Sequence, residues 1–106
     1  MNIYLAGPMR ADPDGCEAKF AYATKRLRAD GHTVFSPAEF MDVMPGLETN
    51  EQLRDVFAVD TNWICKKADA VALLPGWEHS LGATMEYDLA MALGLTIIIL
   101  GDDYVT

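Results

Sequence analysis

Cysteine and basic residues are both scarce in this 106-residue chain. The two cysteines, Cys16 and Cys65, are too few and too scattered for a disulfide framework or a metal site, so a reduced, intracellular setting is expected. Eight Lys and Arg against 16 Asp and Glu leave a formal charge of −8. Binding to nucleic acid, which requires a basic face, is therefore not expected, and neither is binding to an anionic membrane surface.

Long apolar runs and a targeting segment are missing as well. The run LTIIIL near the end is far shorter than a membrane span, and the start, MNIYLAG, lacks the basic and long apolar parts of a signal peptide. These features predict a cytoplasmic protein. No internal repeat or low-complexity tract is present, and 51% of the residues are apolar, which predicts one compact domain over residues 1–106.

Short apolar runs rich in β-branched residues alternate with helical patterns. Strands are expected at residues 3–6, 33–35, 70–74 and 96–100, and the last two are continuously apolar, as in strands covered on both faces. Helices are expected at residues 16–30, from 49 or 50 to 67, and 81–93. This order predicts an α/β protein: a small, single-domain, three-layer α/β/α sandwich with a parallel, flavodoxin- or Rossmann-like sheet of about four strands.

The helix ends carry their own signals. Gly31 and Gly94 are expected to end the first and third helices, and Thr49 with Gln52 forms a Thr-x-x-Gln capping box at the start of the second. Ser80 is the expected N-cap of the third helix. In such folds ligands bind at the carboxyl ends of the strands, where residues 7–15, 36–48 and 75–80 are expected to lie.

Two acidic residues, Asp60 and Glu86, occupy positions where leucine would be expected. At 100° per residue, Glu86 falls within the apolar arc of the third helix, which is made of Gly82, Ala83, Met85, Leu89, Ala90 and Leu93. Asp60 takes the i+7 position of the stripe on the second helix that is made of Leu53, Val56, Phe57 and Ile64. Since unpaired carboxylates are almost never fully buried, both positions require an explanation.

Two explanations are open for these acids. Each could lie at the margin of its stripe and reach water, or pair with Arg10 or Arg54. The two helices, however, flank the same expected strand at residues 70–74. Paired carboxylates at the mouth of an α/β sheet are suited to acid/base or nucleophilic chemistry on a glycosidic bond.

The turn after the first strand, YLAGPMR, is a second candidate feature. Gly7 permits close approach of a ligand to the backbone, and free N–H groups together with Arg10 could hold a phosphate. The alternative is an ordinary strand-ending turn with a surface arginine. Trp77, which follows the third strand, is either a platform for stacking a base or a lid on the core.

Taken in order, the motifs IYLAGPM, SPAE, D…ADAVALLPGW and S-x-G-A-x-x-E resemble the nucleoside 2-deoxyribosyltransferase superfamily over nearly the whole chain. This superfamily includes the 2′-deoxynucleoside 5′-monophosphate N-glycosidases, and the chain is most similar to a compact branch common in bacteria and phages. The resemblance implies that Glu86 is the nucleophile that attacks C1′ of deoxyribose. It further implies that Asp60 contacts the sugar and assists proton transfer, and that Tyr4 orients the nucleophile.

The substrate-binding residues also follow from the resemblance. The first loop is expected to hold the sugar or its phosphate through Gly7, Pro8, Met9 and Arg10. Ser80, Gly82 and Trp77 are expected to complete the pocket. Nucleoside transferases typically carry Asp six residues before the nucleophile, whereas the monophosphate N-glycosidases carry Ser there, as this chain does at Ser80. An uncharged hydroxyl at a helix N-terminus attracts a phosphate that a carboxylate would repel.

The expected function is therefore retaining cleavage or transfer of the N-glycosidic bond of a small-molecule 2′-deoxynucleotide, with no cofactor and no metal. The alternatives are a 2-deoxyribosyltransferase that acts on unphosphorylated deoxynucleosides, a non-catalytic nucleotide-binding module of the same fold, and a structural protein whose two acids form buried polar pairs. A homo-oligomer is expected from the resemblance, and Tyr87 and Met91 on the outer side of the third helix are compatible with a subunit contact.

Overall fold

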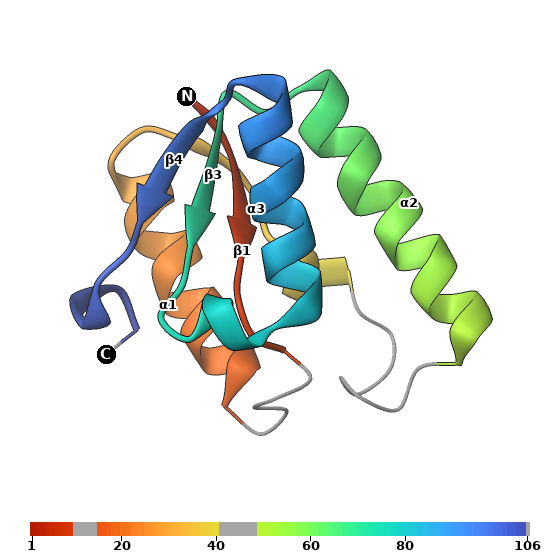
Figure 1. Ribbon diagram of the computed structural model, residues 1–106. Helices are drawn as coiled ribbons and strands as arrows, with labels where there is room; N and C mark the ends of the chain where they lie inside the picture. The colour runs from red at the N-terminus through yellow and green to blue at the C-terminus, as the bar shows by residue number, and fades with distance from the viewer. Residues whose placement is uncertain (10–14, 41–48, 106) are drawn as a thin grey trace.

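The computed structural model describes residues 1–9, 15–40 and 49–105. Its middle layer is a four-stranded parallel sheet in the order β2-β1-β3-β4 (Figure 1). The strands are β1 (Asn2–Ala6), β2 (Thr33–Phe35), β3 (Ala70–Leu73) and β4 (Thr96–Ile99). The helices are α1 (Cys16–Ala29), α2 (Asn50–Lys66) and α3 (Leu81–Leu93), with short 3₁₀ turns η1 (Pro37–Phe40), η2 (Trp77–His79) and η3 (Asp102–Tyr104).

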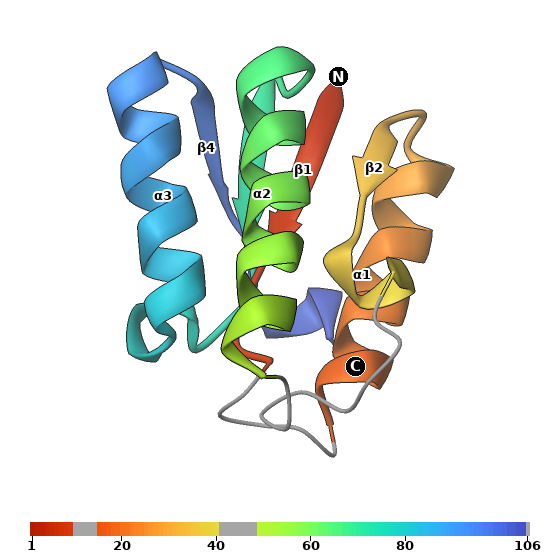
Figure 2. The ribbon, with the colours of Figure 1, turned by 90° about the vertical axis from the view of Figure 1, so that its right-hand side faces the viewer.

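The helices cover both faces of the sheet, as expected for a three-layer α/β/α sandwich. Helix α1 lies on one face, and α2 and α3 lie on the other (Figure 2). The strand order reverses between β1 and β3, because β2 was added on one side of β1 and β3 on the other. In open α/β sheets this switch point is where ligands bind. None of the described helices is both long and apolar enough to cross a membrane.

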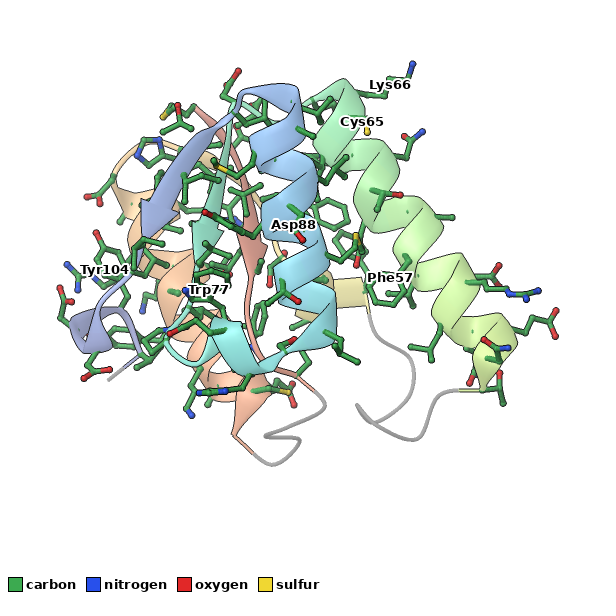
Figure 3. All side chains as sticks on the ribbon, in the orientation of Figure 1. Phe57, Cys65, Lys66, Trp77, Asp88 and Tyr104 are labelled. Atoms are coloured by element: carbon green, nitrogen blue, oxygen red, sulfur yellow. The ribbon has the colours of Figure 1, made fainter. Side chains whose placement is uncertain are left out.

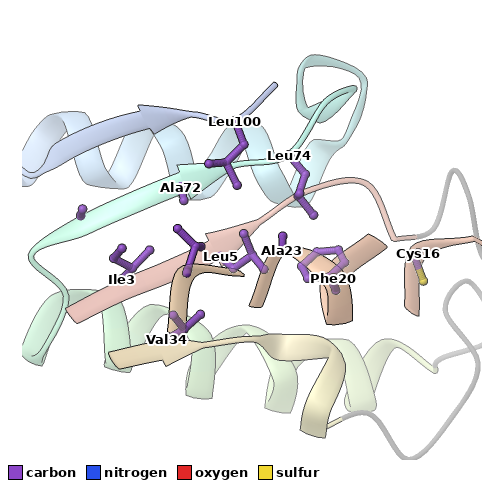
Figure 4. Close-up of a cluster of buried hydrophobic side chains, with 11 residues drawn as sticks. Ile3, Leu5, Cys16, Phe20, Ala23, Val34, Ala72, Leu74 and Leu100 are labelled. Carbon is purple, nitrogen blue, oxygen red and sulfur yellow. The ribbon is translucent and has the colours of Figure 1, made fainter. Parts of the chain in front are cut away.

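Each face of the sheet has its own core. The α1-side cluster contains Ile3, Leu5, Cys16, Phe20, Ala23, Leu27, Val34, Ala70, Ala72, Leu74 and Leu100 (Figure 4). The α2/α3-side cluster contains Tyr4, Ala6, Ile64, Val71, Leu73, Ala83 and Ala90. Successive side chains of a strand point to opposite faces, so Tyr4 points toward α2 and α3 while its neighbours Ile3 and Leu5 point toward α1.

The expected helix ends are confirmed. Thr49 accepts a hydrogen bond from the Gln52 backbone N–H at 3.2 Å, and the Gln52 side chain accepts from the Thr49 backbone N–H at 2.8 Å. The Ser80 hydroxyl accepts from the Ala83 backbone N–H at 3.2 Å. Gly31 and Gly94 follow α1 and α3 with φ of 95° and 72°, a left-handed conformation that glycine adopts without steric cost.

The expectation that β4 is covered on both faces is wrong. Thr96 is exposed, and Ile99 keeps 62% of its surface accessible. The reason is topological: among the described strands, β4 is the last of the sheet and pairs with β3 alone. Leu93, expected on the inward arc of α3, is also 46% exposed, since it lies at the last turn of that helix.

Helix α2 is longer than the sheet that it covers. Its 17 residues span ~25 Å, whereas the four residues of β3 span only ~13 Å. The first half of α2 therefore extends past the carboxyl ends of the strands (Figure 1). Of the expected apolar stripe, only Ile64 is buried; Leu53, Val56 and Phe57 are half-buried and belong to neither core cluster.

Candidate active site

Three polar side chains from three different elements meet beneath α2 and α3. Tyr4 comes from the middle of β1 and is fully buried, while Asp60 of α2 and Glu86 of α3 are each 5% exposed. The Tyr4 hydroxyl donates a hydrogen bond to Glu86 Oε2, and Asp60 lies near enough to the same phenol to influence its pKa. The structure thus brings together all three residues that were expected to be catalytic.

Local periodicity explains how these side chains converge. Glu86 lies between Ala83 and Ala90 on the buried face of α3, so it occupies the centre of that face and not its margin. Asp60 precedes Ile64 by one turn on the buried face of α2. The explanation in which both acids reach water at the edge of their stripes is therefore wrong for this fold.

Two aromatic residues that the sequence did not single out support the Tyr4 ring. Phe35 stacks on it with a centroid separation of 5.5 Å and an interplanar angle of 17°, and Trp63 lies tilted at 6.5 Å. Tyr4 and Phe35 are direct partners in the β1–β2 register, so their side chains point to the same face. The sequence alone could not identify this contact, because it depends on the pairing register of β1 and β2, which only the structure gives.

Burial changes the protonation of the cluster. It raises the pKa of Glu86 to about 8; the Tyr4 hydrogen bond opposes this shift and the nearby Asp60 charge adds to it. Burial likewise raises the pKa of Asp60 to about 6, against a smaller opposing effect of the Tyr4 hydroxyl. The pKa of Tyr4 lies well above its usual value because of burial and the two carboxyls, so the phenol remains a donor. Near pH 7 the carboxyl pair therefore holds one proton, mainly on Glu86.

Gly7 has a packing role at the end of β1. A Cβ atom at this buried position would lie 2.8 Å from Leu74 Cβ, closer than real contacts allow. Leu74 begins the Leu74–Trp77 turn, in which Gly76 has φ of 87° and the Trp77 N–H bonds to the Leu74 carbonyl at 3.2 Å. The loops that follow β1 and β3 are thus packed directly together, which is an alternative to ligand approach as the reason for a glycine.

Replacing Gly7 with alanine is expected to lower the free energy of unfolding by about 1–3 kcal/mol, the usual cost of overpacking. Urea unfolding of the variant and the wild type measures this difference. Lys25→Ala, a change on the exposed side of α1, is the control and should stay within about 0.5 kcal/mol. An unchanged stability in Gly7→Ala would mean that Leu74 moves aside easily and that packing does not explain this glycine.

The expected binding residues on and before α3 are not members of the Tyr4, Asp60 and Glu86 cluster. Ser80 caps α3, and Gly82 lies one turn before Glu86, where a Cβ would be 3.3 Å from the Phe57 ring. Trp77 packs on Tyr87 with centroids 4.8 Å apart, on the side of α3 away from α2 (Figure 3). Trp77 therefore acts as a lid on the α2/α3-side core, and stacking of a base on it stays a prediction.

Two further expected residues belong to the first loop. Met9 packs against the α1-side cluster, and Pro8 lies close to Gly76. Arg10 and most of the segment at residues 36–48 lie outside the described residues. Ser36, at the start of that segment, is 1% exposed, and no hydrogen-bond partner for its hydroxyl is found in the described part of the chain. Neither cysteine joins the cluster, and no metal-binding group of three or more His, Cys, Asp or Glu occurs in residues 1–9, 15–40 and 49–105.

Comparison with known proteins places the chain in a family without assigning an activity. No curated protein matches the sequence significantly. Residues 1–99, nearly the whole chain, match the profile of a domain of unknown function, and the chain therefore belongs to the DUF4406 family.

Proposed function

We propose that this protein cleaves the N-glycosidic bond of a 2′-deoxynucleoside 5′-monophosphate with retention of configuration. The observation that carries the proposal is the buried cluster of Tyr4, Asp60 and Glu86, which lies on the α2/α3 side of β1, one of the two strands that flank the switch point. Two carboxyls that share a buried site favour a transition state with positive charge on the sugar. The motif resemblance to the nucleoside 2-deoxyribosyltransferase superfamily supports the same assignment.

The first chemical step is a displacement at C1′. The ionised Glu86 carboxylate attacks C1′ from the face opposite the base, a C1′–O bond forms, and the C1′–N bond breaks. The electron pair of the broken bond goes to the base, which takes a proton from Asp60. Tyr4 donates to Glu86 Oε2 and so holds the carboxylate in position for attack by its other oxygen, Oε1.

The second step releases the sugar. Asp60, now ionised, accepts a proton from a water molecule, and this water attacks C1′ and breaks the ester to Glu86. The products are the free base and 2-deoxyribose 5-phosphate with the original configuration. A free base in place of water would make the enzyme a transferase.

The protonation state required by this mechanism is a minor one. It needs Glu86 ionised and Asp60 protonated, whereas the pKa values of about 8 and about 6 favour the reverse. Near pH 7 the productive arrangement is therefore the less populated of the two singly protonated forms of the pair. A substrate whose sugar gains positive charge in the transition state stabilises ionised Glu86 most strongly at the moment of reaction.

A phosphorylated substrate fits the start of α3 better than an unphosphorylated one. The N-cap there is Ser80, which carries no charge. Its hydroxyl oxygen accepts the capping hydrogen bond from the Ala83 N–H, so capping does not use the hydroxyl hydrogen, which can be donated to a ligand. The positive end of the α3 dipole lies at the same place. Both features favour a phosphate group over a neutral 5′-hydroxyl.

The test is a chromatographic assay for released base, run from pH 5 to pH 9. Each deoxynucleoside and its 5′-monophosphate is incubated with the protein, with and without a second free base. We expect release from monophosphates only, with a bell-shaped dependence of kcat/KM whose limbs lie near pH 6 and pH 8. Base exchange on nucleosides would instead identify a transferase, and binding without any product would identify a nucleotide-binding module.

A further inference from the structure

The first half of α2, which extends past the carboxyl ends of the strands, carries apolar side chains that pack in neither core cluster. Leu53, Val56 and Phe57 lie on one stripe of this helix, yet they are only half-buried and belong to neither core cluster. An apolar stripe normally serves to bury surface against the core. Its continuation past the carboxyl ends of the strands, at the edge where ligands enter such sheets, points to a second use.

Phe57 is the member of this stripe that lies closest to the acids. It precedes Asp60 by three residues on α2, and its ring packs on Gly82, which precedes Glu86 by four residues on α3. Both helices run opposite to the strands (Figure 1). Because Phe57 and Gly82 precede Asp60 and Glu86 by three and four residues, their contact lies about one turn nearer the carboxyl ends of the strands than the two acids. Phe57 therefore lies about one helical turn from the acids, on the side of the carboxyl ends of the strands.

The surroundings of this ring differ from those of the other aromatic residues near the site. Phe35, Trp63, Trp77 and Tyr87 each pack against another ring. Within the described residues, no second aromatic ring packs on Phe57. Its neighbour Gly82 has no side chain, and a Cβ there would press on the ring at 3.3 Å. The glycine thus leaves room for the Phe57 ring itself, which lies against α3 at Gly82.

We propose that Phe57 is the residue on which the base of the substrate stacks. This inference rests on the proposed function, because it places C1′ at Glu86 and Asp60. The base is bonded directly to C1′, and one helical turn is only ~5.4 Å, so a base that points toward the open edge lies beside the Phe57 ring. Stacking of this kind accepts any base, since every base has a π face.

Binding measurements with and without the base test the inference. In a Glu86→Gln background, which prevents turnover, calorimetry is carried out with the four 2′-deoxynucleoside 5′-monophosphates and with 2-deoxyribose 5-phosphate. Phe57→Leu keeps an apolar side chain against Gly82 but removes the π face. We expect it to weaken binding of the nucleotides by about 5- to 150-fold and to change binding of the sugar phosphate by less than about twofold.

Two further variants separate stacking from packing. Phe57→Tyr should retain nucleotide binding, and Leu53→Ala, one turn farther from the acids on the same stripe, should leave both ligands unaffected. Three results for Phe57→Leu would overturn the stacking role alone. The variant could lose affinity equally for both ligands, keep its nucleotide affinity, or change its oligomeric state while its affinities stay the same. Failure of the Glu86→Gln protein to bind any nucleotide would overturn the proposed function, and the stacking role with it.

Discussion

Glu86→Gln is expected to slow base release by about 10⁴-fold or more, as loss of a catalytic nucleophile commonly does. Glutamine is close to glutamate in size, and its amide oxygen can still accept the hydrogen bond that Tyr4 donates to Glu86 Oε2. The amide cannot form the glycosyl ester. The variant should therefore fold like the wild type and bind nucleotide while its initial rate, measured by chromatography of the released base, falls to background.

A matched control is available on the same helix. Asp88 lies two residues away on the exposed side of α3 (Figure 3), so Asp88→Asn removes a charge without touching the cluster. Its rate should stay within about twofold of the wild type. If Glu86→Gln retained a substantial rate, the covalent mechanism would be wrong and Glu86 would have at most a supporting role in binding the sugar.

The positions of the two clustered acids could be predicted from periodicity. The helix period places Asp60 and Glu86 on inward faces without any knowledge of the tertiary structure, whereas Tyr4 is singled out only by the motif resemblance, since its strand is buried on both faces. The parallel sheet then requires both helices to return across it, which brings their inward faces over the same central strands. An acid at the centre of an inward helix face is a strong indication of a functional site, because a carboxylate is seldom buried there without a partner or a role.

The extent of burial along each element could not be predicted in the same way. Periodicity gives the side of a helix that points inward, but not where along its length the core ends. Leu53, Val56 and Phe57 fit the α2 stripe as well as Ile64 does, yet only Ile64 has the sheet beneath it. The same limit applies to Ile99, whose strand reads as central from its composition although it lies at the edge of the sheet.

The roles of small residues depend on neighbours that are distant in sequence. Gly7 suggested close approach of a ligand, but the nearest obstacle to a side chain there is Leu74. Gly82 is expected from the motif resemblance to line the substrate pocket, but the ring of Phe57 lies against it. A glycine indicates either that a neighbouring group leaves no space for a side chain or that the backbone adopts a conformation that other residues avoid. Only the tertiary structure identifies the neighbouring group.

The stability of the protein is expected to decrease as the pH rises from about 4 to about 8. Burial raises the pKa of Asp60 from 3.8 to about 6 and that of Glu86 from 4.5 to about 8, so the folded state binds both protons more tightly than the unfolded state. The stabilisation is complete below the unfolded values and is lost as each folded pKa is passed. Urea unfolding at pH 4.5, 6, 8 and 9 should reveal a total loss on the order of a few kcal/mol.

Substitutions assign this pH dependence to individual residues. Glu86→Gln should remove the larger part and be more stable than the wild type at pH 9, whereas Asp60→Asn should remove only the part below about pH 6. Glu39, whose pKa is lowered by Arg28, acts in the opposite direction, but this pair is exposed and contributes little. General repulsion in a chain of net charge −8 is nearly the same in wild type and variant, so it cancels in the comparison. If the variant and the wild type lost stability in parallel as the pH rises, general charge repulsion would be the cause of the loss. Ionising the buried Glu86 would then not destabilise the fold, and its burial would need no catalytic explanation.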